Sequence, residues 1–197
     1  DGLLKQRPSW SPNGTEVAFT RHEESDIFVY VLDLQSRQER RLTDSDDPEF
    51  DAVYAPDGES LLLAIDSVSP NQGNVDVACW HVADRRLEDV SDGVGGLSHQ
   101  EWPCWSPHGD RIAFTSPHED NQEVYVADRD GGNPLRLTND SAIDAHPCWS
   151  AGGETIAFAT NRWGDYEIAL ISPSGEGLRR FTSSRGMDDY PAFSPDG

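Results

Sequence analysis

Trp149-Ser150-Ala151-Gly152-Gly153, with the apolar run Ile156-Ala157-Phe158 behind it, is one copy of the motif that decides the fold. An aromatic residue, a short turn and a glycine recur with the aromatic at positions 10, 54, 105, 149 and 193, so the steps are 44, 51, 44 and 44 residues. A fixed period of this size indicates one structural unit that is repeated and that needs its neighbours to bury its faces. The other copies are Trp10-Ser11-Pro12-Asn13-Gly14, Tyr54-Ala55-Pro56-Asp57-Gly58, Trp105-Ser106-Pro107-His108-Gly109 and Phe193-Ser194-Pro195-Asp196-Gly197.

Each complete repeat contains four strand-like pieces. The first holds the lead aromatic residue, and a turn connects it to a short apolar second piece, because proline pre-sets the turn and glycine accepts positive φ. In the first repeat the third piece is Val29–Asp33 and the fourth closes on Leu42-Thr43. Four short strands without a helical period predict an all-β protein, and a four-stranded unit of this length is the size of a propeller blade.

We therefore predict a β-propeller of four-stranded antiparallel blades, with four complete blades and the first strand of a fifth. A single propeller region spans residues 1–197. Its repeats are expected at about 6–43, 50–91, 100–138 and 144–182, with a partial repeat at 189–197. The last repeat stops inside a hairpin turn, which predicts a fragment; the alternative is a ring of four blades whose terminal strand completes the first blade.

The second repeat is longer than the others, and its additional residues can be placed in two segments. Four are expected in the polar stretch Asp66–Asn74, and three in the glycine-rich connection Asp92–Leu97. Insertions in repeat proteins map to loops, often on the binding face.

The motif resembles the WD40-like PD40 repeat of TolB-type propellers. The fourth repeat carries it most clearly, with Asn161-Arg162-Trp163-Gly164-Asp165-Tyr166-Glu167-Ile168 after its Ile-Ala-Phe strand. Related repeats build the propellers of tricorn-type and prolyl-oligopeptidase-type (S9) serine peptidases. The resemblance implies a ring of six blades for the TolB type or seven for the S9 type, so at least two blades would be missing. The Gly-His and Trp-Asp signature of true WD40 repeats is absent.

The charge balance is strongly acidic, with 36 Asp and Glu against 15 Lys and Arg and a net charge of −21. Such a surface repels nucleic acid, so we expect no nucleic-acid partner. The composition fits either adaptation to high salt or plain acidity. No run of about 18 apolar residues occurs, which predicts no membrane insertion.

No cofactor or resident metal is expected. The cysteines, Cys79, Cys104 and Cys148, lack the close ligand pairs of a zinc site and are expected to be structural thiols. Calcium has weak support in the acidic segments Asp44–Glu49 and Asp128–Gly131, neither of which matches an EF-hand loop. No Gly-X-Ser-X-Gly elbow occurs, so we expect no catalytic residue and no enzymatic activity from this segment.

A binding site is expected where the loops entering each first strand converge on the mouth of the central channel. An Asp-X-X-Pro signature of TolB-type repeats is matched by Asp144-Ala145-His146-Pro147 and by Asp188-Asp189-Tyr190-Pro191. The carboxylates of this signature can equally have a structural role, in which they accept hydrogen bonds from the backbone of the loop. A functional mouth would be acidic and aromatic, suited to a cationic peptide or a basic side chain. The candidate residues are Glu49, Asp51, Glu101, Trp102, Asp144, His146, Asp188 and Tyr190.

Two functions follow from these observations. The first is a non-enzymatic, TolB-like scaffold that binds a protein or peptide at its channel mouth, which would place it in the periplasm or outside the cell. The second is the propeller domain of an S9-type peptidase whose catalytic domain lies elsewhere in the polypeptide, which would place it in the cytoplasm. In both, further blades or domains of the same polypeptide are expected as partners.

Overall fold

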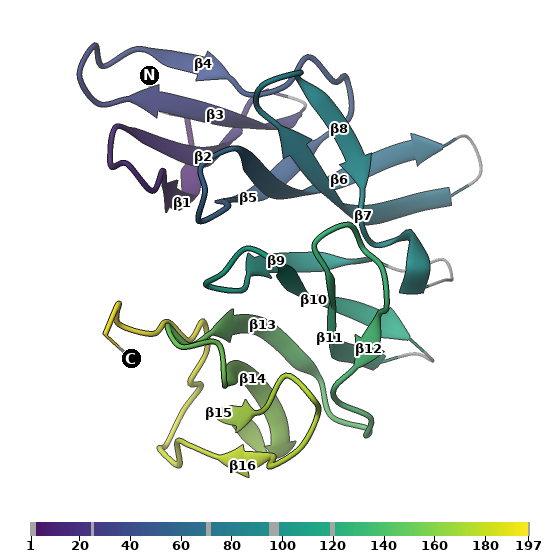
Figure 1. The fold of residues 1–197 in the computed structure, drawn as a ribbon. Coiled ribbons are helices and arrows are strands. Elements are labelled where there is room, and N and C mark those ends of the chain that lie inside the picture. The colour runs from purple at the N-terminus through teal and green to yellow at the C-terminus, as the bar shows by residue number, and fades with distance from the viewer. Residues whose placement is uncertain (1–2, 25, 70–71, 95–98, 119–120, 197) are drawn as a thin grey trace.

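The computed structural model describes residues 3–24, 26–69, 72–94, 99–118 and 121–196. Within them the chain forms four antiparallel sheets of four strands each. Figure 1 shows these sheets as blades arranged about a common centre, with the first strand of each blade innermost. The all-β propeller predicted from the repeats is confirmed.

Each blade is one sequence repeat, and its strands follow one another in chain order across the sheet. Blade 1 contains β1 (Lys5–Trp10), β2 (Glu16–His22), β3 (Ile27–Asp33) and β4 (Glu39–Arg41). Blade 2 contains β5 (Glu49–Tyr54), β6 (Ser60–Ser69), β7 (Gln72–His81) and β8 (Arg86–Asp89), followed by the 3-10 turn η1 (Asp92–Val94). Blade 3 contains β9 (Glu101–Trp105), β10 (Arg111–His118), β11 (Asn121–Asp128) and β12 (Leu135–Arg136). Blade 4 contains β13 (Asp144–Trp149), β14 (Ile156–Trp163), β15 (Asp165–Ile171) and β16 (Arg179–Arg180).

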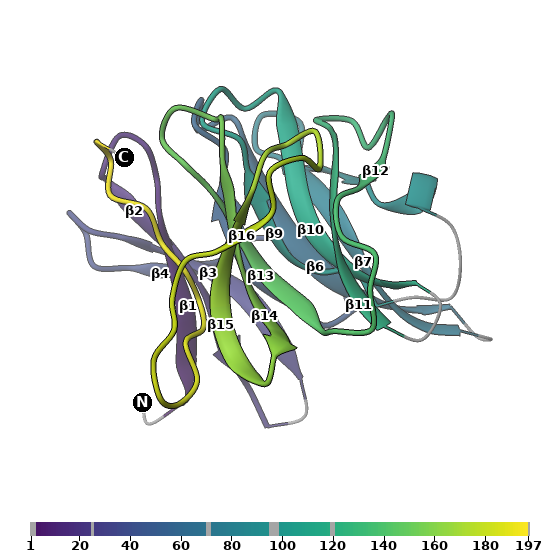
Figure 2. The ribbon, with the colours of Figure 1, turned by 90° about the horizontal axis from the view of Figure 1, so that it is seen from below.

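The core lies between blades, because the side chains of each strand alternate between the two faces of its sheet. Phe114 packs in the cluster between blades 2 and 3, whereas its neighbour Ala113 packs between blades 3 and 4. The lead aromatic residues Tyr54, Trp105 and Trp149 each sit in the interface with the preceding blade. Figure 2 shows the blades side by side with their faces turned toward each other. Each blade therefore needs a neighbour to complete its core, as the repeat period predicts.

The structure locates the insertion of the second repeat. β6 and β7 pair in an unbroken register from Ser60–His81 to Ser69–Gln72, which makes the longest hairpin of the described chain. The extra residues of Asp66–Asn74 thus lengthen two strands rather than widen a loop. The other expected insertion falls partly on residues 95–98, which lie outside the described residues.

The fourth strands are shorter than the sequence pattern predicts. β4 ends at Arg41, one residue before the closing pair Leu42-Thr43, although Leu42 N–H still donates to Val29 O at 2.9 Å. No helix among the described residues has the length and apolar character needed to cross a membrane.

Residues 191–194, the predicted first strand of a fifth blade, run along blade 4 without a strand partner. Phe193 nevertheless packs on the blade 4 cluster of Ala157, Ile168 and Leu170, which is the place of a lead aromatic residue. The terminal segment does not complete blade 1, since β1 already fills the innermost position there. That part of the four-bladed alternative is not observed.

Candidate functional site at the propeller channel

Every innermost strand carries a β-bulge at the same position. The pairing of β1 with β2 shifts between Gln6 and Ser9, and the pairing of β5 with β6 shifts between Phe50 and Val53. β9 and β13 show corresponding shifts against β10 and β14. The second bulged residue is proline in most repeats, and proline, which cannot donate to a ladder, is tolerated in strands at such positions. The bulge turns the first bulged residue, which comes directly before the proline position, out of the hydrogen-bond ladder between the two strands.

That preceding residue adopts a left-handed backbone in all five repeats. The residues lie three positions before each lead aromatic, and they are Arg7 (φ 55°), Asp51 (57°), Trp102 (54°), His146 (54°) and Tyr190 (52°). Asparagine and glycine occupy this conformation at little cost, yet neither is used here. The backbone is therefore repeated while the side chain differs in every blade.

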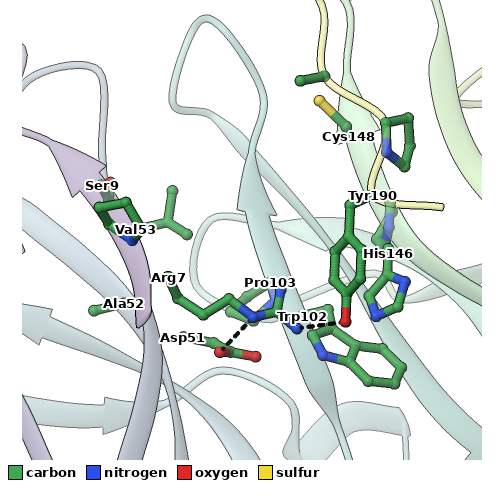
Figure 3. Close-up of a pocket in the computed structure, with 14 residues that line it drawn as sticks. Arg7, Ser9, Asp51, Ala52, Val53, Trp102, Pro103, His146, Cys148 and Tyr190 are labelled. Atoms are coloured by element: carbon green, nitrogen blue, oxygen red, sulfur yellow. Dashed lines mark hydrogen bonds and ion pairs between the residues drawn. The ribbon is translucent and has the colours of Figure 1, made fainter. Parts of the chain in front are cut away.

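These five positions meet at the centre of the propeller and line a cavity of about 440 Å³. Figure 3 shows Arg7, Asp51, Trp102, His146 and Tyr190 converging from separate segments. The cavity wall consists of the bulged residue and the one or two residues after it in each repeat: Arg7, Pro8, Ser9, Asp51, Ala52, Val53, Trp102, Pro103, His146, Pro147, Cys148, Tyr190, Pro191 and Ala192. We call this cavity the channel pocket.

Arg7 connects the two sides of the channel pocket. Its Nε lies 3.3 Å from Asp51 Oδ1, and its Nη2 donates to the Tyr190 hydroxyl at 3.2 Å. The guanidinium also lies 4.6 Å from the centre of the Tyr190 ring. The first repeat therefore contacts the second through a carboxylate and the fifth through a hydroxyl and a ring face.

His146 lies between two aromatic rings. Its imidazole stacks on Tyr190 with centroids 3.9 Å apart and meets the Trp102 ring edge-on at 4.1 Å. Its Nδ1 is 2.5 Å from Asp189 Oδ1, and because a carboxylate only accepts, Nδ1 carries the proton. Nε2 is then an acceptor, and it is buried without a hydrogen-bond partner. Burial lowers the pKa of His146 against the raising effect of Asp189, which favours the neutral ring.

The acidic groups near the pocket are partly desolvated. Burial raises the pKa of Asp51, while the charge of Arg7 opposes that rise. Burial also raises the pKa of Glu101, and the neighbouring charge of Asp51 adds to it. A site of this kind, with crowded acids and rings, favours a ligand that brings positive charge.

The structure brings together four of the eight sequence-predicted residues, namely Asp51, Trp102, His146 and Tyr190. Glu49 and Asp144 instead lie fully buried two positions earlier in their strands. Glu49 accepts from the Thr43 hydroxyl at 2.5 and 2.7 Å.

Asp144 pairs with Arg162 at 2.7 Å, which ties the start of blade 4 to its own second strand. Asp188 accepts hydrogen bonds from the Ser184 hydroxyl, and that bonding lowers its pKa. Glu101 is half-buried beside Asp51 and is not part of the cavity wall.

Arg7 was missed by the sequence analysis, although one signal could have found it. It lies three residues before Trp10, as Asp51 lies three before Tyr54. Arg7 is the basic member of this set.

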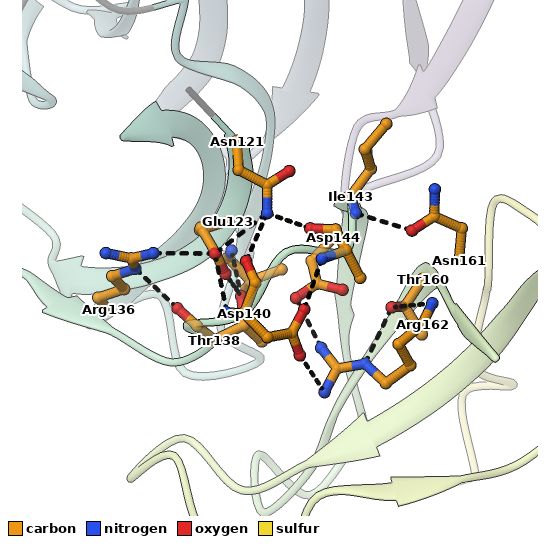
Figure 4. Close-up of polar contacts among 12 residues, drawn as sticks. Asn121, Glu123, Arg136, Thr138, Asp140, Ile143, Asp144, Thr160, Asn161 and Arg162 are labelled. Carbon is orange, nitrogen blue, oxygen red and sulfur yellow. Dashed lines mark hydrogen bonds and ion pairs between the residues drawn. The ribbon is translucent and has the colours of Figure 1, made fainter. Parts of the chain in front are cut away.

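A second set of polar contacts lies at the outer strands and recurs in blades 3 and 4. In blade 3 the Thr138 hydroxyl donates to Glu123 Oε2 at 2.5 Å, and Arg136 Nη2 donates to Glu123 Oε1 at 2.9 Å (Figure 4). The Val124 N–H donates back to Thr138 Oγ1 at 3.0 Å. We call this arrangement the Glu–Thr–Arg clasp.

Blade 4 repeats the clasp with Glu167, Thr182 and Arg180. In blade 1 the glutamate position holds Phe28, and the Arg41 guanidinium lies 3.5 Å from the centre of that ring. The clasp therefore fastens the third strand of a blade to its fourth strand.

Within the described ranges, no three or more His, Cys, Asp or Glu side chains are placed to hold one metal ion. Asp44 pairs with Arg85 at 2.6 Å, and Asp128 accepts from Asn133 at 2.7 Å. Cys79, Cys104 and Cys148 are free thiols, and burial raises the pKa of each.

Solved structures similar to this chain share the propeller fold. Putative TolB from Agrobacterium tumefaciens superposes with a TM-score of 0.87 at 22% identity, covering 100% of this chain and 68% of that one. TolB from Acinetobacter baumannii gives 0.81 at 24% identity, over 96% of this chain and 46% of that one. A puromycin-hydrolyzing peptidase of Mycobacterium tuberculosis gives 0.76 at 16% identity, over 98% of this chain and 33% of that one.

Sequence relatives cover less of the chain. An uncharacterised protein of Agrobacterium fabrum is 27% identical over 144 residues, which are 66% of this chain and 46% of that protein. The Tol-Pal system protein TolB of Francisella tularensis is 24% identical over 61% of this chain and 26% of its own length. The chain thus spans less than half the length of these relatives. The family described as the TolB beta propeller domain (PD40) matches residues 65–197, more than half of the sequence, and the chain belongs to that family.

Proposed function

We propose that this chain is the recognition part of a binding propeller, and that the channel pocket holds a segment of a protein or peptide. The observation that carries the proposal is that the bulge keeps one backbone conformation in every repeat while its side chain changes. Five repeats present the same left-handed backbone with Arg7, Asp51, Trp102, His146 and Tyr190 as side chains. A purely structural position in a repeat protein keeps its chemical class, as the lead residues do by remaining aromatic. Variation on a constant backbone is what a site for an asymmetric ligand requires.

The shape and lining of the pocket support the same function. A cavity of about 440 Å³ accommodates one or two side chains of a peptide. Tyr190 is 57% exposed, so one ring is accessible to a ligand. Aromatic rings and an arginine are the groups that most often dominate protein-recognition energies. The Tol-Pal name of the Francisella relative agrees with a role among interacting proteins.

A pool of defined pentapeptides tests this function directly. We expect some of the peptides to bind and to change the NMR chemical shifts of residues at the bulges of β1, β5, β9 and β13 only. Trp102→Ala should abolish these changes. Trp163→Ala is the matched control, because Trp163 is an exposed tryptophan at the blade 4 hairpin and away from the pocket lining. Equal losses in both variants, or shifts at the outer strands only, would remove the channel pocket as the binding site.

The second candidate is the propeller of an S9-type peptidase. Its support is the structural likeness to the puromycin-hydrolyzing peptidase, in which the matched region is a third of the chain. Labelling the full-length native protein with a fluorophosphonate separates the two. A polypeptide of about 600 residues or more that reacts with the probe would be a peptidase. A shorter polypeptide that stays unlabelled and shows NMR chemical-shift changes on addition of peptide would be a binding propeller. The two candidates also differ in compartment, extracytoplasmic for the first and cytoplasmic for the second.

A further inference from the structure

The channel pocket already contains a cation, and its contacts indicate what a ligand would use. Arg7 meets a carboxylate on Asp51, a hydroxyl on Tyr190 and the face of the Tyr190 ring. A carboxylate combined with an aromatic face is the combination with which proteins hold the guanidinium or ammonium group of a partner. All three contacts join groups from different repeats.

Several hydrogen-bond acceptors lie in or beside the channel pocket. Asp51 and Asp189 present carboxylates, and His146 Nε2 is a buried acceptor without a donor. Glu101 lies near enough to Asp51 for their charges to interact. The cation of Arg7 therefore lies among several acceptors, and the cation of a ligand in the same place would compensate the same acids.

Arg7 is also held loosely enough to be exchanged. Its side chain is 32% exposed, and its ion pair with Asp51 consists of one nitrogen–oxygen contact at 3.3 Å. The Asp51 side chain is 9% exposed, so Arg7 is the accessible member of the pair, and the cation of a ligand can take its place beside the carboxylate. The Tyr190 ring has an exposed portion through which a ligand can approach.

We propose that the channel pocket binds an arginine or lysine side chain of a peptide between Tyr190 and Asp51, in the place that Arg7 fills in the free protein. Arg7 is then an internal competitor that the ligand displaces. The proposal rests on the peptide-binding function and names the ligand class for the same pocket. The net charge of −21 adds a long-range attraction for basic segments.

The probe is the peptide acetyl-Gly-Arg-Gly-amide, with its citrulline analogue as the uncharged isostere. We expect calorimetric binding of the arginine peptide and none of the citrulline peptide. Asp51→Asn should weaken binding at least fivefold. Arg7→Ala should tighten it several-fold, because the competitor is gone.

Arg7→Gln serves as a second variant, since it keeps a polar side chain, and thermal melts establish that each variant is folded. Weaker binding by both folded Arg7 variants would overturn the proposal, since Arg7 would then be a ligand contact. Equal affinity for the arginine and citrulline peptides would overturn it as well.

The failure of this inference is distinguishable from the failure of the proposed function. If neutral or acidic peptides bind the pocket and lose affinity in Trp102→Ala while the arginine peptide does not bind, only the cation assignment is wrong. If no peptide of any charge perturbs the bulges, both proposals fail.

Discussion

The Glu–Thr–Arg clasp and the channel pocket are two polar regions of the same repeats, and they differ in what is repeated. In the clasp the residue types recur, with Glu123 and Glu167 making the same contacts in successive blades. In the channel pocket the backbone recurs and the residue types change, from Arg7 to Asp51 to Trp102. The comparison separates groups that maintain the blade from groups that are free to recognise a ligand. Substitutions can test this separation.

The largest effect is expected in the cluster between blades 2 and 3. Phe114 is fully buried there, so Phe114→Ala should lower the free energy of unfolding by about 3–5 kcal/mol through a cavity that the rigid strands cannot close. Chemical denaturation measures the loss. A change below about 1 kcal/mol would mean that the blades do not depend on one another for their core.

The clasp should come next. Glu123 is 0% exposed, and Glu123→Ala removes the buried carboxylate that accepts from Arg136 and Thr138, which should cost about 3 kcal/mol. Glu167→Ala is the matched variant in blade 4. Its partner Arg180 is 37% exposed and can be hydrated, so a smaller loss is expected. Equal losses in denaturant melts would show that exposure of the arginine has no influence on the clasp.

Glu49 should make stability depend on pH. Burial raises its pKa to about 7, against the opposing effects of the Thr43 hydrogen bond and the Arg41 charge, with Asp47 adding to the rise. The native state therefore binds this proton more tightly than the unfolded chain. Its contribution, roughly 3 kcal/mol at most, is fully present below about pH 4.5 and is lost as the pH rises through about 7.

Glu49→Gln should remove that part of the pH dependence and should stabilise the protein at pH 8 relative to the parent chain. Glu59→Gln is the control, because Glu59 is exposed on a turn. Denaturant melts between pH 5 and pH 8 measure both. If the parent and Glu49→Gln lose stability in parallel over this range, Glu49 is not the group that titrates.

The smallest effect on stability is expected in the channel pocket. Trp102→Asn removes a large ring, but asparagine accepts the left-handed backbone at φ 54° more readily, so the two effects oppose each other. The change in unfolding free energy should stay below about 1 kcal/mol, while peptide binding disappears. A loss comparable to that of Phe114→Ala would place Trp102 in the structural core and would weaken the distinction between the two regions.

The blades were predictable because their signals are local and repeated. The lead aromatic, the turn glycine and the Ile-Ala-Phe strand each specify one element, and Trp105, Gly109 and Phe114 take the roles that the pattern implies. The long β6–β7 hairpin was not predicted, since a polar segment between strands reads as a loop. Only the pairing partner shows that it is a strand.

The channel pocket was predicted in part. The place before each first strand predicts Asp51, Trp102, His146 and Tyr190, which line the pocket, but it also predicts Glu49, which is buried inside its blade. In a regular strand, residues two positions apart share a face. The left-handed residue at the bulge changes that relation, so that Glu49 points into the blade and Asp51 lies at the pocket. A bulge of this kind leaves no distinct mark in the sequence when Ala52 replaces the proline.

The repeated bulge has a consequence for how such a protein can change. Four of the five pocket positions are each oriented by their own strand and Tyr190 by the terminal segment, and all five share one left-handed backbone although their side chains differ. Substitutions there are modular: specificity can be altered blade by blade, and combinations can be assembled without redesigning the scaffold. A library randomised at these five codons would sample new ligands at a nearly constant folding stability.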